Sequence, residues 1–344
     1  MGFCPVLLAK ARRLMVVLAP DETSSLSSIR PFSITRDLPA LADLVEVCFE
    51  DELERTNSRI VADMREMAHL GAWLYLLALS GSPYRGLIWE DRGRMLGNVS
   101  MARERGRIWS LSNVAVSPES RGRGIAGLLV DAALMELRRL RADRVILQVR
   151  PENTVAVGLY ERRGFVAVDR VCELALAADV ALPMPVERRS DLEIRSPRRS
   201  DVPGLLALQF GDLAGIARGT DPLECPARWE RSTLRGVWMA LKQGLGGLEH
   251  TSVVALAGEQ PVGVGWLAVR LLGTYHEIGL AVPVGSGAGV GEAVLQAVIA
   301  RLGAYPQREL RATVSTRHPD ALDALHDAGF VVLRTLDRMV LRLD

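Results

Sequence analysis

The sequence repeats itself at a spacing of 165 residues, and this repeat limits what the chain can fold into. At that offset residues 116–165 match residues 281–330 without a gap, and within one residue of it 29–41 match 194–205 and 87–97 match 253–263. Identical pairs include Pro118 and Pro283, Gly122 and Gly287, Gly124 and Gly289, Ala156 and Ala321, and Phe165 and Phe330. A period this long indicates a duplicated domain, not a solenoid of short repeats. A chain of 344 residues can bury an adequate core in each of two copies.

The most informative segment of the first copy is a glycine-rich turn between a predicted strand and a predicted helix. Residues 113–116 (NVAV) predict a short apolar strand, and a helix is expected to begin at Ile125. The turn between them contains Arg121, Gly122, Arg123 and Gly124. Glycines let the backbone approach a phosphate closely, and the free N–H groups at a helix start attract anions. We therefore expect this turn to bind a pyrophosphate.

Other interpretations of the turn fit less well. The segment 122–127 (GRGIAG) matches the dinucleotide pattern GxGxxG. However, five residues separate it from its strand, and no acidic residue ends the next predicted strand, VILQV at 145–149. A P-loop is excluded because no GK[ST] follows. Taken alone, the turn could also be a strand-to-helix connection without a ligand.

A second motif follows in the same copy. After the strand at 145–149 comes RPEN, and then the pattern NxxAxxLYxxxGF, which begins at Asn153 and includes Tyr160. Together with VSPESRGRGIA at 116–126, this pattern resembles the GNAT superfamily of acyl-CoA-dependent N-acetyltransferases. The resemblance implies an α/β (α+β) fold in which each copy is a mixed, mostly antiparallel sheet flanked by helices. It also implies acetyl-CoA as co-substrate and no metal.

The resemblance assigns roles to individual residues. The turn would bind the pyrophosphate of acetyl-CoA, and the strand ending in NVAV would splay from its neighbour to admit the pantetheine arm. Asn153 would touch that arm, and Tyr160 would lie near the thioester sulfur as the catalytic acid. The implied acetyl-CoA contacts are Val114, Ala115, Val116, Arg121, Gly122, Arg123, Gly124, Ile125, Ala126, Asn153 and Tyr160.

The second copy has lost the side chains that carry this chemistry. At the same offset Arg121 corresponds to Ser286, Arg123 to Ala288, Asn153 to His318 and Tyr160 to Leu325. The glycines remain, so the backbone of the turn is expected to keep its shape. We expect an N-terminal extension at 1–28, a catalytic domain at 29–185 and a degenerate GNAT-like domain at 186–344, with a linker at 181–189. The degenerate copy would have a structural or substrate-shaping role.

Local signals also place helices. An aspartate followed within two residues by a proline predicts helix starts near Asp37 and Asp201. After the glycine turn, apolar residues recur at helical spacing and predict one buried face. That face would contain Ile125, Leu128, Leu129, Ala132, Ala133, Leu137 and Leu140.

Composition limits the remaining function classes. A hydrophobic content of 49% with 24% charged residues and a net charge of +1 is typical of a soluble globular protein and gives no indication of nucleic-acid binding. The four cysteines are far apart, and the five histidines lack the spacing of metal ligands. The apolar run at 70–79 is too short to span a bilayer. We expect a cytoplasmic protein without a membrane partner.

The acceptor is the least determined part of the prediction. Residues 46–54 contain five carboxylates, which either attract a protonated amine or, as we favour, face water: Glu46, Glu50, Asp51, Glu52 and Glu54. Some GNAT relatives that acetylate protein N-termini have a glutamate, assigned as the base, where this chain has Gln148. The base is therefore either relayed through water or elsewhere, with Glu90, Glu104 and the 50–54 cluster as candidates.

The sequence thus predicts an acetyl-CoA-dependent N-acetyltransferase (EC 2.3.1.-) acting on a primary amine of a small molecule or peptide. The alternative is a non-catalytic acyl-CoA-binding sensor or interaction module. Tyr160 favours the enzyme, because a sensor needs no acid beside the sulfur. The sequence leaves the oligomeric state open.

Overall fold

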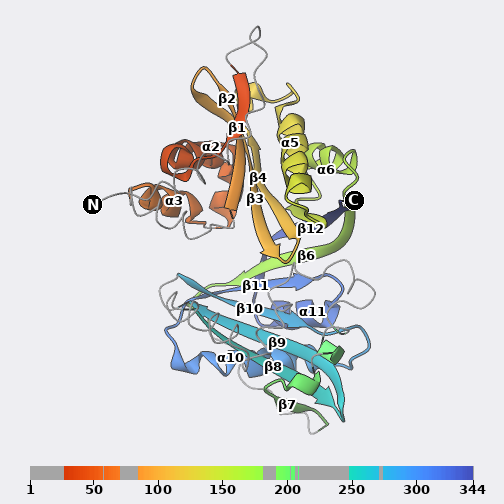
Figure 1. Cartoon of the computed structure of the whole chain (residues 1–344). Coiled ribbons are helices and arrows are strands. Elements are labelled where there is room, and N and C mark those ends of the chain that lie inside the picture. Colours follow the sequence, from red (N-terminus) through yellow and green to blue (C-terminus); the bar gives the residue numbers. More distant parts are fainter. Residues whose placement is uncertain are drawn as a thin grey trace, which may run out of the picture.

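One mixed β-sheet of twelve strands runs through both copies, which together form an α/β fold. The computed structural model describes residues 27–56, 58–69, 84–180, 191–201, 203–205, 208, 248–270 and 274–343. Within these residues the strand order is β1-β2-β3-β4-β5-β12-β6-β11-β10-β9-β8-β7. Figure 1 shows the sheet passing from one half of the molecule to the other through β12 and β6.

In the first copy, antiparallel strands lead into a parallel connection around a helix. The strands are β1 (Ser27–Pro31), β2 (Tyr84–Asp91), β3 (Arg94–Arg105), β4 (Ile108–Val116), β5 (Arg144–Val149) and β6 (Val166–Leu176). The helices are α2 (Ile34–Arg55), α3 (Ile60–His69), α5 (Ile125–Arg139) and α6 (Thr154–Glu161). Helices α2 and α3 cover one face of the sheet, and α5 and α6 cover the other (Figure 1).

The second copy repeats this order over the residues that the structure describes. Its strands are β7 (Glu193–Arg195), β8 (Leu248–Ala257), β9 (Gln260–Arg270), β10 (Tyr275–Ala281), β11 (Glu309–Ser315) and β12 (Val331–Arg342). Helix α10 (Val290–Ile299) follows β10, and α11 (Pro319–Asp327) follows β11. Strands β4 and β10 each pair in parallel with the strand that follows the next helix.

The two copies exchange their last strands at the centre of the sheet. Strand β12 lies between β5 and β6, both of the first copy, and is antiparallel to each. Strand β6 in turn lies between β12 and β11, both of the second copy. Met339 of β12 is buried in the first copy's core, and Leu174 of β6 is buried in the second copy's core. Each core is therefore completed by a strand from the other copy.

Two local predictions were wrong. Helix α2 begins at Ile34, three residues before Asp37, whose buried carboxylate accepts the Ser33 N–H at 2.7 Å and pairs with Arg30 at 2.7 Å. In α5, Leu128 is 49% exposed, and the buried face is instead completed by Val130 and Leu134.

The expected linker at 181–189 and the apolar run at 70–79 lie outside the described residues. None of the helices described is long and apolar enough to cross a membrane. In the same part of the chain there is no group of three or more His, Cys, Asp or Glu side chains that could hold a metal ion.

Candidate active site

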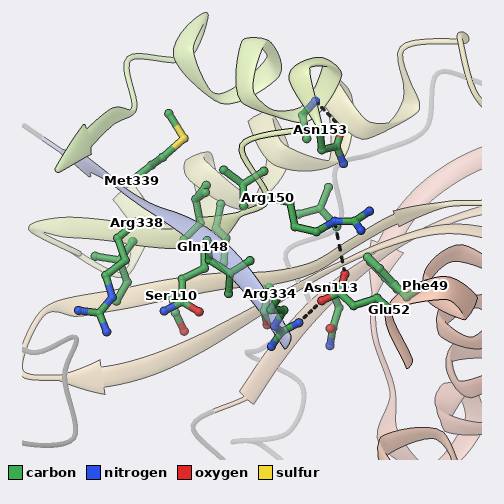
Figure 2. A pocket seen from close by; sticks show the side chains of 18 of the residues that line it. Phe49, Glu52, Ser110, Asn113, Gln148, Arg150, Asn153, Arg334, Arg338 and Met339 are labelled. Carbon is green, nitrogen blue, oxygen red and sulfur yellow. Dashed lines mark hydrogen bonds and ion pairs between the residues drawn. The ribbon is translucent and has the colours of Figure 1, made fainter. Parts of the chain in front are cut away.

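A cavity of about 660 Å³ opens where β4 and β5 diverge. The two strands pair only from Ile108 with Arg144 to Ser110 with Ile146, and beyond these pairs they separate. Residues of α2 and α6, the diverging strand ends, and residues of β6 and β12 line the cavity. Figure 2 shows labelled side chains of α2, β4, β5 and β12 around it, with Arg338 and Met339 on opposite faces of β12.

A bulge in β4 lies beside the opening. Ser112 pairs with Ser100 of β3 and Ala115 pairs with Asn98, so Asn113 and Val114 stand outside this ladder. Asn113 has a φ of +49°, a left-handed conformation that an asparagine tolerates better than most residues. The buried Asn98 amide donates to the Asn113 carbonyl oxygen at 3.0 Å and so supports the bulge from behind.

The glycine-rich turn leads into the N-terminus of α5. Gly122 and Gly124 each have a φ of +76°, which explains the glycines, and no side chain caps the helix. A Cβ added at either glycine would meet nothing within 4 Å, so the space beside the turn is open. Arg121 and Arg123 are both exposed there. The first N–H groups of α5 are therefore available to an anion, with two guanidinium groups nearby.

The structure places Asn153 and Tyr160 on the cavity wall. Asn153 caps α6 by accepting the Ala156 N–H at 3.1 Å, so part of its amide already has a structural task. Tyr160 is 7% exposed, and its ring contacts Phe165 edge to face at 5.8 Å. Burial raises the pKa of Tyr160 to about 12, so its hydroxyl stays protonated at physiological pH.

The other predicted acetyl-CoA contacts differ in their exposure to a ligand. Val114 lines the cavity with Asn153 and Tyr160. Ala115 and Ile125 are buried in the fold, so only their backbone groups could serve a ligand. Val116 uses its carbonyl oxygen to accept the Cys48 thiol at 3.3 Å and Arg121 Nε at 3.3 Å. Ala126, in the first turn of α5, is partly exposed.

The wall of the cavity that faces α2, here called the acceptor wall, contains residues of both copies. On β12, Arg334, Leu336 and Arg338 line it, and across the ladder Arg338 pairs with Gln148 of β5 and Asp169 of β6. Glu173 of β6 also lines the acceptor wall.

Ion pairs connect the acceptor wall to α2. Arg334 pairs with Glu52 and, at 2.7 Å, with Glu173, while Arg150 Nε lies 3.9 Å from Glu52 (Figure 2). Arg338 lies 3.5 Å from Asp169. The second copy thereby holds α2 and β6 of the first copy in place around the cavity.

The structure reduces the number of carboxylates that could act as the general base for the acceptor amine. Four of the five carboxylates at 46–54 are exposed, as favoured, and Glu52 alone of these lines the cavity, where it is held by arginines. Glu90 is bound to Arg30 and does not line the cavity. Glu104 does line it, accepts the Ser110 hydroxyl at 2.5 Å, and has no ion pair with a basic residue in the part of the chain described. Of the proposed candidates, Glu104 is therefore the carboxylate that lines the cavity without an ion pair to an arginine among the described residues.

Comparison with known proteins agrees with this geometry. Residues 39–165 match the model of the Acetyltransferase (GNAT) family. The first copy is a GNAT acetyltransferase domain. The mycothiol acetyltransferase of Geodermatophilus obscurus is 45% identical over 52 residues, 15% of this chain and 17% of that protein. That of Salinispora arenicola is 32% identical over 142 residues, 40% of this chain and 44% of the relative. The matched segments thus span less than half of either relative.

Two solved structures match nearly the whole GNAT chain in fold. A GCN5-related N-acetyltransferase from Sphaerobacter thermophilus has a TM-score of 0.60 at 18% identity, covering 94% of this chain and 96% of its own. A tandem GNAT protein from the clavulanic acid biosynthesis pathway has a TM-score of 0.52 at 13% identity, covering 92% and 98%. The predicted fold class and the tandem GNAT architecture are therefore confirmed.

The second copy keeps the shape of the glycine-rich turn. Gly287 and Gly289 have φ values of +97° and +78°, and Gly289 stands at the start of α10 as Gly124 does in α5. The Ser286 hydroxyl, however, donates to the Pro283 carbonyl oxygen at 2.8 Å. The backbone turn persists as expected, without the two guanidinium groups.

The parallel pairing extends one residue pair further in the second copy. Strand β10 has no bulge against β9 and pairs with β11 as far as Ile278 with Ala312, beyond which the two strands are no longer paired. The indole of Trp266 packs over Gly279 so closely that an added Cβ there would lie 2.2 Å from its Nε1. Gly279 pairs with Trp266 across the ladder of β9 and β10, so the indole covers this part of β10.

The helices of the second copy are also closer together. An added Cβ on Gly291 of α10 would lie 2.3 Å from the Asp320 carbonyl oxygen at the start of α11. In place of Tyr160 the fully buried Leu325 packs into the core. A ligand would have to separate α10 from α11 to lie between them.

Sequence reasoning missed the acceptor-wall residues on β6 and β12. Charged residues four apart in a predicted strand, such as Asp169 with Glu173 and Arg334 with Arg338, show that these side chains share one face. They do not show which cavity that face lines, because this depends on the exchange of strands between copies.

Proposed function

We propose that this chain is an acetyl-CoA-dependent N-acetyltransferase that acts on a primary amine of a small molecule or peptide. The observation that carries the proposal is the opening between β4 and β5, a polar chamber with a buried tyrosine on its wall, in the same copy as an uncapped helix N-terminus. The acetyltransferase names of the relatives support the same reaction class.

The first copy's residues suit acetyl-CoA in a definite orientation. The N–H groups at the start of α5, with Arg121 and Arg123, would hold the pyrophosphate. The pantetheine arm would then run along the bulged part of β4 past Asn153. Backbone groups of Asn113 and Val114, outside the β3 ladder, are placed to donate to the thioester carbonyl oxygen.

The remaining residues would manage protons and position the amine. Tyr160, protonated and buried beside the opening, would donate a hydrogen bond to the sulfur as negative charge develops on it. On the other side of the sheet Glu104 would take a proton from the acceptor's ammonium group, directly or through water, so that the neutral amine attacks the thioester carbonyl and the CoA thiolate leaves. Most of the rate gain would come from holding the amine against the thioester.

In this proposal the two sequence copies have different tasks. Residues 29–185 bind acetyl-CoA and perform the chemistry, and 186–344 complete the sheet and the acceptor wall. The Trp266 indole and the close contact between α10 and α11 both support binding to the first copy alone.

Calorimetry with acetyl-CoA, followed by a thiol-release assay over a panel of amines, tests the proposal. We expect one site per chain, and free CoA released only when an acceptor amine is present. Binding without release for any amine would contradict the enzyme and favour an acyl-CoA sensor. Absence of binding would contradict both.

A further inference from the structure

The polar part of the cavity is balanced in charge. Four carboxylates line it, Glu52, Glu104, Asp169 and Glu173, together with four guanidinium groups, Arg150, Arg311, Arg334 and Arg338. A buried acceptor whose net charge is strongly positive or negative would leave charge uncompensated in such a chamber, which is expensive away from water.

The two signs come from different copies. All four carboxylates belong to the first copy, whereas three of the four arginines belong to the second, on β11 and β12. With Arg150 alone, the first copy's chamber would be acidic and would attract polyamines. The second copy's arginines remove that preference, so they determine which amines are accepted.

We propose that the acceptor is a zwitterionic amine, namely an amino acid or short peptide with a free carboxylate, and that Arg338 of the second copy holds this carboxylate. The inference rests on the proposed acetyltransferase function. A zwitterion gives each sign of charge in the chamber a partner, and a guanidinium group matches a carboxylate in a planar, two-bonded geometry.

The position of Arg338 suits this task. Its side chain is 10% exposed and lies across the ladder from Gln148, close to where β4 and β5 separate. Its contact with Asp169, at 3.5 Å, is longer than a strong charge-assisted hydrogen bond. Asp169 also accepts the Ser315 hydroxyl at 2.7 Å, so this carboxylate keeps a partner if the guanidinium group turns toward a substrate.

The test compares matched acceptors on the wild-type chain. The free amino acids and a set of dipeptides are assayed for CoA release, and each one that is acetylated is compared with its C-terminal amide and its decarboxylated amine. Spermidine and an aminoglycoside represent polycations. We expect kcat/KM to fall at least about tenfold when the carboxylate is removed or amidated.

A pair of variants assigns that preference to a residue. Arg338→Gln should reduce the preference for the carboxylate to less than threefold, mainly through KM of the acceptor, while acetyl-CoA affinity is retained. Arg170→Gln is the matched control, because Arg170 pairs with Asp337 at 2.6 Å between the same two strands, β6 and β12, but does not line the cavity.

The outcomes separate this inference from the proposed function. Equal acetylation of acid and amide, or a preference for polycations, would overturn the zwitterion and leave the acetyltransferase intact. An unchanged carboxylate preference in a folded Arg338→Gln variant would overturn the role of Arg338. No CoA release in any arm would overturn both proposals. If Arg338→Gln does not fold, the wild-type comparison still decides the substrate class.

Discussion

Replacing Tyr160 with phenylalanine tests the proposed chemistry at a single atom. The ring stays against Phe165, so the loss of the hydroxyl should leave acetyl-CoA affinity and the melting temperature nearly unchanged. If the hydroxyl acts only when the sulfur becomes negative, the substitution lowers kcat without changing the binding of acetyl-CoA.

The pKa of the buried phenol sets the size of the effect. A free tyrosine has a pKa near 10, and burial raises that of Tyr160 to about 12, whereas a thiol has about 8.5. Complete proton transfer from this phenol to the departing thiolate would be uphill by about 5 kcal/mol, so the hydroxyl donates a hydrogen bond without giving up its proton. A hydrogen bond to a charged group contributes about 1.5–3 kcal/mol, which corresponds to a loss of roughly 10- to 150-fold in kcat.

The assay is kcat at saturating acetyl-CoA and acceptor from pH 6 to pH 10.5, under conditions where chemistry is rate-limiting. Because Tyr160 titrates near pH 12, its ionisation should produce no alkaline decrease in this range. Tyr305→Phe is a control, since it removes a hydroxyl that donates to Glu249 far from the cavity. More than half of wild-type kcat in Tyr160→Phe, or an alkaline decrease near pH 10 that this variant abolishes, would refute the reasoning.

Three further predictions concern the turn and the fold. Arg121→Ala should weaken acetyl-CoA binding about tenfold or more, and Ser286→Ala should not; two equivalent sites per chain in calorimetry would contradict this. Gly124→Ala forces an L side chain to a φ of +76° and should lower stability by about 1–2 kcal/mol as well as acetyl-CoA affinity, whereas Gly289→Ala, at +78°, should lower stability alone. Despite burial, hydrogen bonds from arginines hold the pKa of Asp37 at about 2, below its usual 3.8, so its stabilisation is complete above about pH 4 and is lost as pH falls through about 2. Asp37→Asn should therefore be about 2 kcal/mol less stable than wild type at pH 7 and equal to it near pH 2, as followed by urea unfolding.

Local signals made much of the fold predictable. The duplicated motifs predicted the two copies, and the glycine-rich turn predicted the helix that begins at Ile125. Asp37 was misplaced because an aspartate before a proline marks the first turn of a helix in general, while here its carboxylate serves the backbone N–H of Ser33 and the guanidinium group of Arg30. Leu128 was misplaced because regular apolar spacing does not show where the buried face ends.

The acceptor wall could not be predicted, because it depends on long-range pairing. Arg338 is separated by 169 residues from its partner Asp169, and nothing near either residue in the sequence indicates that β12 lies between β5 and β6. A model with two independent domains would pair β6 with β5, and the arginines of β12 would then face a different site. The residues that we expect to select the acceptor are thus the ones least visible in the sequence.

The strand exchange explains how the second copy can be required even if it binds no acetyl-CoA. Without β12, strands β5 and β6 would each present an unpaired edge, and the first copy's core would lose Met339. Without β6, the edge of β11 would be exposed in the same way. If acetyl-CoA binds to the first copy alone, as we propose, the second copy's turn residues are not constrained by this ligand. Substitutions on β12 affect the first copy's core on one face of the strand and its acceptor wall on the other. The second copy is therefore constrained most strongly where it builds the first copy's site.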